Sequence, residues 1–187
     1  MIIALSGLAG SGKDTVADVL SMNARCERVA FADPMKQFAR EVFEFSHDQL
    51  YGPSAMRNAP DPRYTRPNGE ALTPRFALQT LGTEWGRNCD PSLWAKVGVR
   101  RAIELEKAGL VAVITDCRFI NEAKLVREAG GLVWFVDRGL AASSTHPSET
   151  EMLSPEFQAL VTVTVSNKRS LWDLAVSVRA HLRWVAP

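Results

Sequence analysis

The strongest constraint on the fold lies in residues 1–15. An apolar run, Ile2-Ile3-Ala4-Leu5-Ser6, leads directly into Gly7-Leu8-Ala9-Gly10-Ser11-Gly12-Lys13-Asp14-Thr15. The apolar run predicts a short buried strand, the glycines allow a sharp turn, and a helix is expected to start near Lys13. Backbone N–H groups then point at one spot, where the lysine adds positive charge and the helix adds its dipole. The pattern predicts a loop that binds the β- and γ-phosphates of a nucleotide.

The loop departs at one position from the usual pattern G-x-x-x-x-G-K-[ST]. Asp14 stands where a magnesium-binding hydroxyl usually follows the lysine, and Thr15 comes one residue later. Adenylate-kinase-like enzymes often show the same arrangement, which favours a kinase of small molecules over a GTPase or a motor. Asp14 is then a candidate magnesium ligand, directly or through water, because Mg²⁺ accepts few carboxylates and keeps several waters. A glycine-rich turn that binds nothing is the alternative, disfavoured by the strand, the spacing and the lysine.

Length and composition limit the class of protein. The 187 residues fit one domain, 1–187, and the formal net charge of +1 argues against bulk binding of nucleic acid or a membrane surface. Cys26, Cys89 and Cys117 lack the spacing of a disulfide framework or a zinc site and are interpreted as reduced thiols. No signal segment and no membrane-length apolar run is apparent, so a cytoplasmic protein is expected. Whether it is a monomer or a homodimer stays open.

Apolar runs alternate with helical patterns along the rest of the chain. Further strands are predicted at 28–32, 110–114, 132–136 and 160–165, and helices at 34–43, 74–85, 121–129 and 170–184, with another after residue 91 that runs through Lys107. Asp33 is expected to cap the helix that starts at Pro34, and residues 86–91 to break the helical pattern. The Pro- and Gly-rich stretch 46–73 is predicted as a long surface excursion. The alternation predicts an α/β fold, a doubly wound parallel sheet of about five strands with helices on both faces.

Phosphoryl transfer requires positioning and neutralisation of phosphate charge, so acids and arginines at strand ends are the candidates. Asp116 follows the strand at 110–114, the position of a Walker-B acid, although it can also cap the next helix. Arg118 is expected at the same edge, where a guanidinium can bind two phosphate oxygens, unless it is a surface arginine. Arg138 follows the next strand and can reach the phosphates if residues 139–147 close; a solvated loop residue is the alternative.

Five segments carry a family resemblance when they are taken in order. They are Gly10–Thr15 (GSGKDT), Phe31–Lys36 (FADPMK), Leu78–Glu84 (LQTLGTE) with Arg87, Asp116–Glu122 (DCRFINE) and His146–Glu149 (HPSE). Together they resemble the bacteriophage deoxynucleoside monophosphate kinases, within the P-loop nucleoside monophosphate kinase group. The resemblance implies transfer of the γ-phosphoryl group of ATP to a deoxynucleoside monophosphate with Mg²⁺, giving ADP and a deoxynucleoside diphosphate. It also implies a phage protein acting in the host cytoplasm.

The resemblance implies two groups of site residues around the phosphates. Those that would bind ATP are Gly7, Gly10, Ser11, Gly12, Lys13, Asp14, Thr15 and, near the donor adenine, Asn167. Those that would act in the transfer are Lys13, Arg118, Arg138 and Asp116. Asp14 and Asp116 would hold the metal. An ordinary turn or cap residue is the alternative for Asn167.

The acceptor site is implied by the same resemblance. Asp33 with Lys36 is similar to the pair with which the wider kinase group grips the acceptor phosphate, and Arg118 would touch the acceptor or the transferred phosphate. Arg138 would belong to a lid-like segment at about 138–148. An acceptor-binding excursion at about 46–90 would contribute pocket walls from Arg75, Gln79, Glu84, Trp85 and Arg87. A core position at helical spacing is the alternative for Trp85.

Two other functions stay open at this point. One is a P-loop kinase of another phosphorylated metabolite, similar to a dephospho-coenzyme A kinase. The other is a nucleotide-dependent switch, against which the arginines at strand ends argue; Ser166–Arg169 also lacks the acid of a guanine-reading [NT]-K-x-D motif. His146 is not needed as a general base, because an acceptor phosphate is already anionic at neutral pH.

Overall fold

The computed structural model describes residues 1–142 and 147–185, which fall into two compact units. The sheet unit comprises Met1–Phe31 and Ala95–Pro187, and the helical insert comprises Ala32–Trp94. No helix in the described ranges is both long and apolar enough to cross a membrane. The organisation of residues 1–187 as one domain, with an acceptor-binding excursion at about 46–90, stays a prediction.

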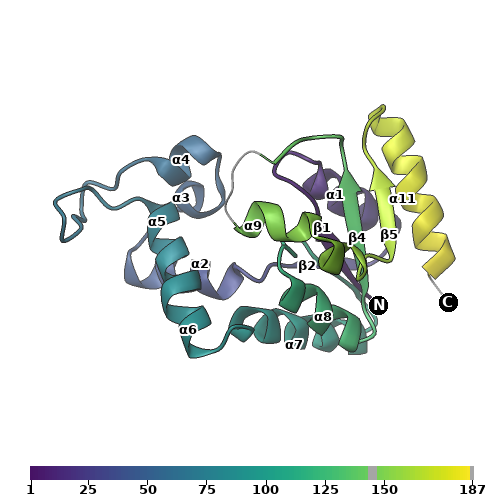
Figure 1. The fold of residues 1–187 in the computed structure, drawn as a ribbon, viewed down its shortest axis with the longest axis horizontal. Coiled ribbons are helices and arrows are strands. Elements are labelled where there is room, and N and C mark those ends of the chain that lie inside the picture. The colour runs from purple at the N-terminus through teal and green to yellow at the C-terminus, as the bar shows by residue number, and fades with distance from the viewer. Residues whose placement is uncertain (143–146, 186–187) are drawn as a thin grey trace. The chain divides into compact units, whose positions relative to one another are not determined.

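The sheet unit contains a five-stranded parallel sheet with the order β2-β3-β1-β4-β5 (Figure 1). Its strands are β1 (Ile2–Ser6), β2 (Cys26–Val29), β3 (Val111–Ile114), β4 (Leu132–Asp137) and β5 (Val163–Ser166). In the centre, Ala4 of β1 pairs with Ile114 of β3 and Val133 of β4. The predicted doubly wound parallel sheet is therefore confirmed. The loop after β1 leaves the carboxyl edge of the central strand, the edge at which such sheets bind ligands.

Helices cover both faces of the sheet, as predicted. On one face, α1 (Lys13–Asn23) and α11 (Leu171–Val185) share a core with strand side chains such as Leu5 and Trp134. Side chains alternate along a strand, so the buried Ile2, Ala4 and Ile114 point to the other face. The helices of that layer are α8 (Ile120–Glu128), which contacts β1 and β4, and α7 (Leu93–Lys107), which lies beside α8 (Figure 1). The chain then continues through α9 (Pro147–Thr150), the 3₁₀ turn η2 (Glu151–Leu153) and α10 (Pro155–Gln158).

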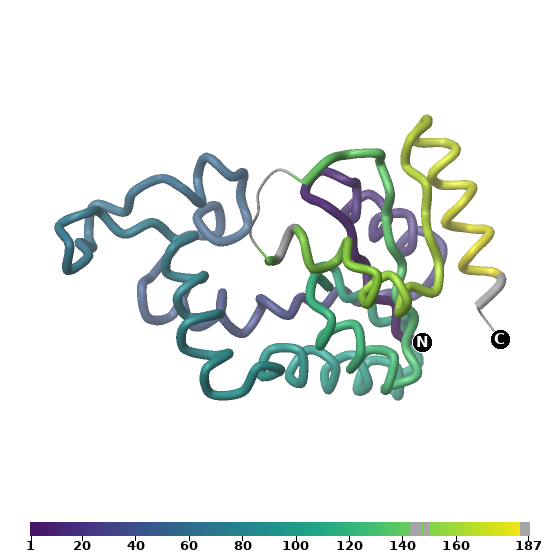
Figure 2. The backbone as a smooth tube through the Cα atoms, viewed as in Figure 1, coloured from purple at the N-terminus to yellow at the C-terminus, as the bar shows by residue number. Residues whose placement is uncertain are grey.

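The helical insert is built from short helices around a small core. They are α2 (Asp33–Val42), α3 (His47–Tyr51), α4 (Ser54–Asn58), α5 (Pro74–Gln79), the π-helix η1 (Thr80–Gly86) and α6 (Arg87–Cys89). The core contains Ala39, Phe45, Leu50 and Ala77. Between α4 and α5 the chain runs out and back as an extended loop (Figure 2), joined near its end by a bridge between Thr65 and Ala71.

Both edge strands begin and end at different residues than predicted. The predicted strand at 28–32 is β2, Cys26–Val29, because pairing with β3 is confined to those residues; beyond them the amide of Phe31 binds Asp116 instead. The predicted strand at 160–165 is β5, Val163–Ser166, because Leu160 and Val161 complete a turn after α10. An edge strand has one neighbour, so its limits depend on that neighbour rather than on its own apolar run.

Two local predictions in the insert were wrong. Asp33 is the first residue of α2 rather than its cap; Ala32 is the cap, without a side-chain hydrogen bond. Helical structure continues through most of the predicted break, to Cys89, and Gly86 lies against the Trp94 ring, where a side chain would not fit. The predicted excursion at 46–73 also contains α3 and α4, the first stabilised by a capping box that Ser46 forms with Gln49.

Candidate functional site

The backbone of the phosphate loop requires glycine. Gly7, Gly10 and Gly12 have φ angles of +139°, +76° and +97°, a region that other residues rarely adopt. At Gly7 a Cβ atom would also lie 2.6 Å from the carbonyl oxygen of Val136 and 2.8 Å from Ser11 Oγ. The glycines read from the sequence are therefore needed both for the path of the chain and for its packing against β4.

Lys13 folds back over the loop that precedes it. Its Nζ donates hydrogen bonds to the carbonyl oxygens of Gly7, at 2.7 Å, and Leu8, at 2.9 Å. A phosphate is a charged acceptor, and hydrogen bonds between two charged groups are stronger than those to a neutral carbonyl. The ammonium is thus placed at the mouth of the loop, in a position to exchange carbonyl partners for phosphate oxygens.

Ser11 is tied to the sheet by Asn167. The side-chain amide of Asn167 donates to the Ser11 carbonyl at 2.8 Å. The backbone amide of Asn167 donates to the backbone carbonyl of Asp137 at 2.7 Å. A Cβ atom at Gly12 would collide with the Asn167 amide. The Ser11 hydroxyl is buried, with 1% of the residue exposed, and has no hydrogen-bond partner among the described residues. An unsatisfied buried donor inside a glycine-rich loop fits a bound phosphate.

Arg138 also contacts the loop, because its guanidinium donates to the Gly10 carbonyl at 3.1 Å. The neighbouring Asp137 is held by Lys168 Nζ, 2.7 Å from Oδ2, and by the Gly139 amide, 2.7 Å from Oδ1. These hydrogen bonds, that of Lys168 first, keep the pKa of Asp137 below its ordinary value. The predicted lid-like segment at about 138–148 includes residues 143–146, which lie outside the described residues, so the lid stays a prediction.

Asp116 and Arg118 follow β3, the neighbour of β1. The Cys117 amide donates to Leu5 at 3.2 Å, which places this segment beside the strand that leads into the phosphate loop. Asp116 Oδ1 accepts from the Phe31 amide at 2.8 Å. Burial, with the charges of Glu122 and Asp116, raises the pKa of the Cys117 thiol well above its ordinary value. This cysteine is therefore a neutral packing residue.

Glu122 fixes the position of Arg118, a role the sequence analysis missed. The buried carboxylate accepts from the backbone amides of Arg118, at 2.7 Å, and Phe119, at 3.0 Å. Glu122 stands at the third position of α8, where a glutamate commonly reaches back to the helix start. That helix-start signal in the sequence would have identified it. His146 lies outside the described residues, and the side chains of Ser148 and Glu149 are not described.

The carboxylates near the loop fit one mode of metal binding. Among the described residues, no three or more His, Cys, Asp or Glu side chains gather into a metal cage. Mg²⁺ does not require one, because it is commonly bound by one or two carboxylates together with waters and substrate phosphates. Asp14, exposed in the first turn of α1, and Asp116, at the end of β3, are suitable donors for that mode.

The predicted acceptor residues all lie in the helical insert, apart from Arg118. Asp33 and Lys36 lie on α2, and Arg75 on α5 donates to Ser54 Oγ at 3.4 Å. The others are distributed along the continuous helix from α5 to α6: Gln79, Glu84, Trp85 and Arg87. Trp85 is 56% exposed, which excludes the alternative of a core residue; its ring lies 6.3 Å from that of Trp94.

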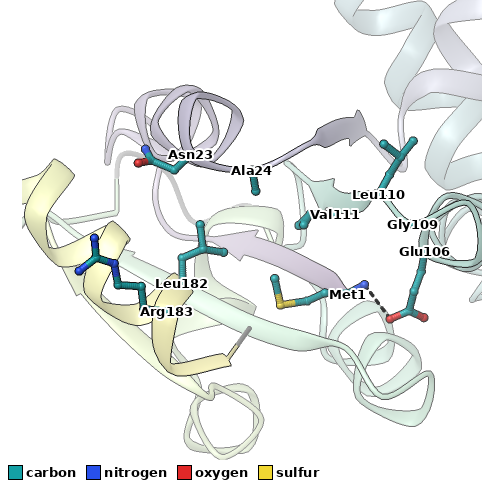
Figure 3. A pocket seen from close by; sticks show the side chains of 9 residues that line it. All are labelled: Met1, Asn23, Ala24, Glu106, Gly109, Leu110, Val111, Leu182 and Arg183. Atoms are coloured by element: carbon teal, nitrogen blue, oxygen red, sulfur yellow. Dashed lines mark ion pairs between the residues drawn. The ribbon is translucent and has the colours of Figure 1, made fainter. Parts of the chain in front are cut away.

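Cavities among the described residues also lie away from the phosphate loop. A groove of about 680 Å³ in the insert is lined mainly by apolar side chains, among them Phe38, Phe76 and the predicted acceptor residue Trp85. A cavity of about 370 Å³ in the sheet unit lies beside Leu110 and Leu182, where the Met1 amino group pairs with Glu106 at 2.9 Å (Figure 3). Because β1 and β3 begin there, this cavity is at the sheet edge opposite the phosphate loop.

The loop and the strand order define a class. A lysine and a set of glycines between the central strand of a parallel sheet and the following helix are the phosphate-binding apparatus of P-loop proteins. The chain is therefore a P-loop protein, of the class that binds a nucleotide through its phosphates. A protein of Acanthamoeba polyphaga mimivirus, "Putative deoxynucleotide monophosphate kinase", is 35% identical over 179 residues, covering 90% of this chain and 89% of the viral protein. The chain belongs to the deoxynucleotide monophosphate kinase family that this viral protein represents.

Other comparisons concern family models and solved structures. No family model matches the chain. Shikimate kinase from Aquifex aeolicus superposes with a TM-score of 0.48 and 15% identity, covering 98% of this chain and 96% of that enzyme. Shikimate kinase from Bacteroides thetaiotaomicron gives a TM-score of 0.43 and 11% identity, covering 99% of this chain and 98% of that enzyme.

Proposed function

We propose that the protein transfers the γ-phosphoryl group of ATP to a deoxynucleoside monophosphate, giving ADP and a deoxynucleoside diphosphate. The observation that carries the proposal is the phosphate loop, in which Lys13 and Arg138 bind loop carbonyls and the Ser11 hydroxyl is buried without a partner in the described chain. The identity of the acceptor is supported by the name of the viral relative.

The donor phosphates would bind at the loop after β1. Its backbone amides and the α1 N-terminus attract phosphate oxygens, and Lys13 would exchange its contacts with Gly7 and Leu8 for the β- and γ-phosphates. Arg138 would leave the Gly10 carbonyl for the transferred group, where a guanidinium can neutralise charge. Asp14 and Asp116 would hold Mg²⁺, which supplies charge neutralisation on the phosphates when bound.

The acceptor would bind through its own phosphate. Lys36, with Asp33 near it on α2, and Arg118 are the proposed contacts of that phosphate, while Arg75, Gln79, Glu84, Trp85 and Arg87 are the proposed walls for the sugar and base. No general base is needed, because the attacking group is an anionic phosphate oxygen at neutral pH. Catalysis in this scheme consists of positioning and charge stabilisation.

The setting implied by the resemblance stays an expectation. The relative comes from a mimivirus, so a bacteriophage source and action in a host cytoplasm stay predictions. A monomer and a homodimer are equally compatible with the proposal.

The first test is acceptor dependence. The purified protein is incubated with ATP and Mg²⁺ and, separately, with each deoxynucleoside and ribonucleoside monophosphate, and ADP and the new diphosphate are quantified. We expect the two products in equal amounts and only when a deoxynucleotide acceptor is present. Release of ADP at the same rate without any acceptor would contradict the proposal and favour a nucleotide switch. Turnover only with another phosphorylated metabolite would favour a different kinase.

A further inference from the structure

The ring of Tyr51 lies against the ammonium group of Lys36 in the helical insert. Lys36 Nζ is 4.0 Å from the centre of the Tyr51 ring, within the range of about 6 Å in which a cation is attracted to a ring face. The imidazole of His47 stacks on the same side chain, with ring centres 5.0 Å apart and planes inclined by 22°. Tyr51 is 48% exposed, so this contact is open to an incoming ligand.

Tyr51 is the last residue of α3, which is firmly attached to the rest of the insert. Five residues are too few for a stable isolated helix, so α3 depends on other contacts. The Ser46 amide donates to Gln49 Oε1 at 2.8 Å, and the Gln49 amide donates to Ser46 Oγ at 3.3 Å, forming a capping box. The adjacent Leu50 is buried in the insert core. Tyr51 therefore follows directly after an anchored residue.

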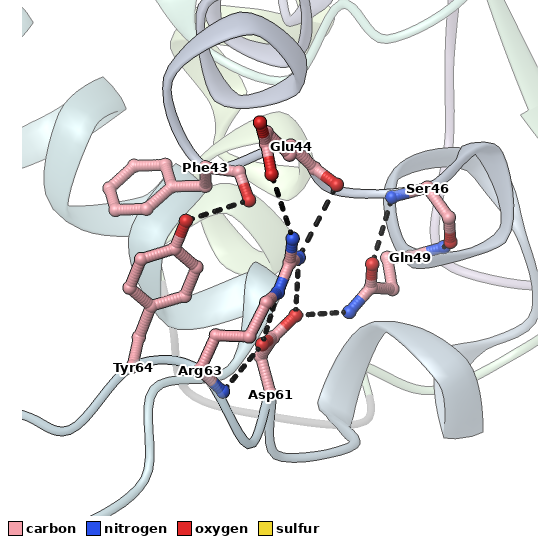
Figure 4. A network of polar contacts seen from close by, with 7 residues as sticks. All are labelled: Phe43, Glu44, Ser46, Gln49, Asp61, Arg63 and Tyr64. Atoms are coloured by element: carbon pink, nitrogen blue, oxygen red, sulfur yellow. Dashed lines mark hydrogen bonds and ion pairs between the residues drawn. The ribbon is translucent and has the colours of Figure 1, made fainter.

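A buried carboxylate adds a second attachment (Figure 4). Asp61, 2% exposed, accepts from Gln49 Nε2 at 2.8 Å and from the Arg63 guanidinium at 2.9 Å and 3.0 Å. Arg63 in turn donates to the side chain and the backbone carbonyl of Glu44, both at 3.3 Å. The network thereby joins the start of the extended loop to Glu44, which precedes α3, and to Gln49 within α3, and so helps to fix the position of Tyr51.

The Tyr51 phenol is neutral at physiological pH. Burial, followed by the charge of Asp33, raises its pKa above the ordinary value, and Arg40 opposes the shift. The contact with Lys36 is then that of a cation with an uncharged ring rather than an ion pair with a phenolate. A ring face holds an ammonium group without neutralising it, so the contact with Tyr51 does not itself cancel the charge with which Lys36 would bind a phosphate.

We propose that Tyr51 is a positioning residue that holds Lys36 in place for the phosphate of the acceptor nucleotide. The inference rests on the proposed function, in which Lys36 binds that phosphate. It also explains why a helix as short as α3 is held by a capping box, a core leucine and a buried carboxylate. Without the ring, the flexible Lys36 side chain would sample more conformations, and acceptor binding would carry the cost of ordering it.

The test compares Tyr51→Leu, which removes the ring, with Tyr51→Phe, which keeps the ring and removes only the hydroxyl. For Tyr51→Leu we expect the KM for the deoxynucleotide to rise about two- to fivefold, the size expected for an exposed cation–ring contact, with kcat and the KM for ATP unchanged. Tyr51→Phe is expected to match the unmodified protein. Thermal unfolding checks that both variants are folded.

The decisive measurement repeats Tyr51→Leu in a Lys36→Gln background. If the ring acts through Lys36, Tyr51→Leu should not raise the KM further in the Lys36→Gln background. The inference is overturned if the increases in KM caused by the two substitutions multiply. It is also overturned if Tyr51→Phe is as impaired as Tyr51→Leu. Calorimetric binding of the deoxynucleotide that is phosphorylated fastest replaces KM if Lys36→Gln turns over too slowly. Failure of the unmodified protein to phosphorylate any deoxynucleotide would instead reject the proposed function itself.

Discussion

The phosphate loop and the helical insert are held in shape by different parts of the chain. The shape of the loop depends on its backbone. Its glycines adopt positive φ angles, and its backbone carbonyls accept hydrogen bonds from Lys13, Arg138 and Asn167. In the insert, side chains hold the structure, through a small apolar core and the network around Asp61. A change in the loop should therefore remove chemistry while the fold persists, and a change in the insert should remove stability first.

The largest effect is expected for Lys13→Ala. Loss of a positive group that faces the developing charge should lower kcat about 100- to 1000-fold, a range typical of removing one stabilising donor. The thermal midpoint should change little, because the path of the loop is set by its glycines rather than by the hydrogen bonds of Lys13 to Gly7 and Leu8. The rate of ADP formation tests the expected fall in kcat, and thermal unfolding tests the expected unchanged midpoint. The control is Lys107→Ala, which removes an exposed lysine at the end of α7. A large fall in the thermal midpoint of Lys13→Ala would contradict the expectation that changes in the loop leave the fold intact.

A smaller effect on the same region is expected for Asp14→Asn. The magnesium concentration that gives half-maximal rate should rise about tenfold, the lower end of the range seen when a carboxylate at a metal site is altered. Asp18→Asn, one turn further along α1, is the matched control because it removes the same charge away from the loop. An unchanged magnesium titration for Asp14→Asn would remove this residue from the metal site.

Asn167→Ala separates two roles of that residue. If its amide holds the Ser11 carbonyl, the KM should rise about two- to tenfold for ATP and for GTP alike, as for one lost hydrogen bond. If Asn167 instead reads the adenine, as the family resemblance implies, the KM for ATP alone should rise. Initial rates with both triphosphates decide between these outcomes. An equal rise would show that the loop depends on its side-chain tie to the end of β5.

The smallest effect on the chemistry, and the main effect on stability, is expected for Asp61→Asn. Loss of the charged pair with Arg63 should lower the thermal midpoint by about 2–4 °C, while ATP binding at the loop is retained. Asp48→Asn, an exposed change of the same charge on α3, is the control. Loss of ATP affinity without loss of stability would contradict the comparison.

The same variant should alter the response to acid. Hydrogen bonds from Arg63 lower the pKa of Asp61 in the folded protein, so its stabilising effect is complete above the unfolded pKa of about 4 and is lost as the pH falls further. The urea midpoints of the unmodified protein and of Asp61→Asn, measured between pH 7 and pH 2, should therefore differ most at neutral pH and converge in acid. Curves that stay parallel would show that the ionisation of Asp61 contributes no stability.

The sequence was informative where few residue types permit a structure. The phosphate loop could be predicted because its positive φ angles require glycine at Gly7, Gly10 and Gly12. The central strands were predicted because a strand buried on both faces reads as a continuous apolar run. Arg138 and Asn167 were singled out by their positions just after β4 and β5, but their hydrogen bonds to the carbonyls of Gly10 and Ser11 were not predicted.

What could not be predicted depends on partners distant in sequence. The limits of β2 and β5 are set by their single neighbours, and Asp61 meets Gln49 and Arg63 meets Glu44 without any periodic pattern. The π-helical turn at 80–86 has no residue signature. Even so, Ser46 and Gln49 form a recognisable capping box that would have located α3, and with it Tyr51.

The contacts of Lys13 and Arg138 with loop carbonyls also make the loop a filter for charge. When Lys13 and Arg138 bind a ligand, they lose their hydrogen bonds to the carbonyl oxygens of Gly7, Leu8 and Gly10. A monovalent anion offers little to offset that loss, whereas the adjacent phosphates of a nucleotide offer several charged oxygens at once. Chloride and other simple anions should therefore compete weakly, and the loop stays in its binding shape until a polyphosphate arrives.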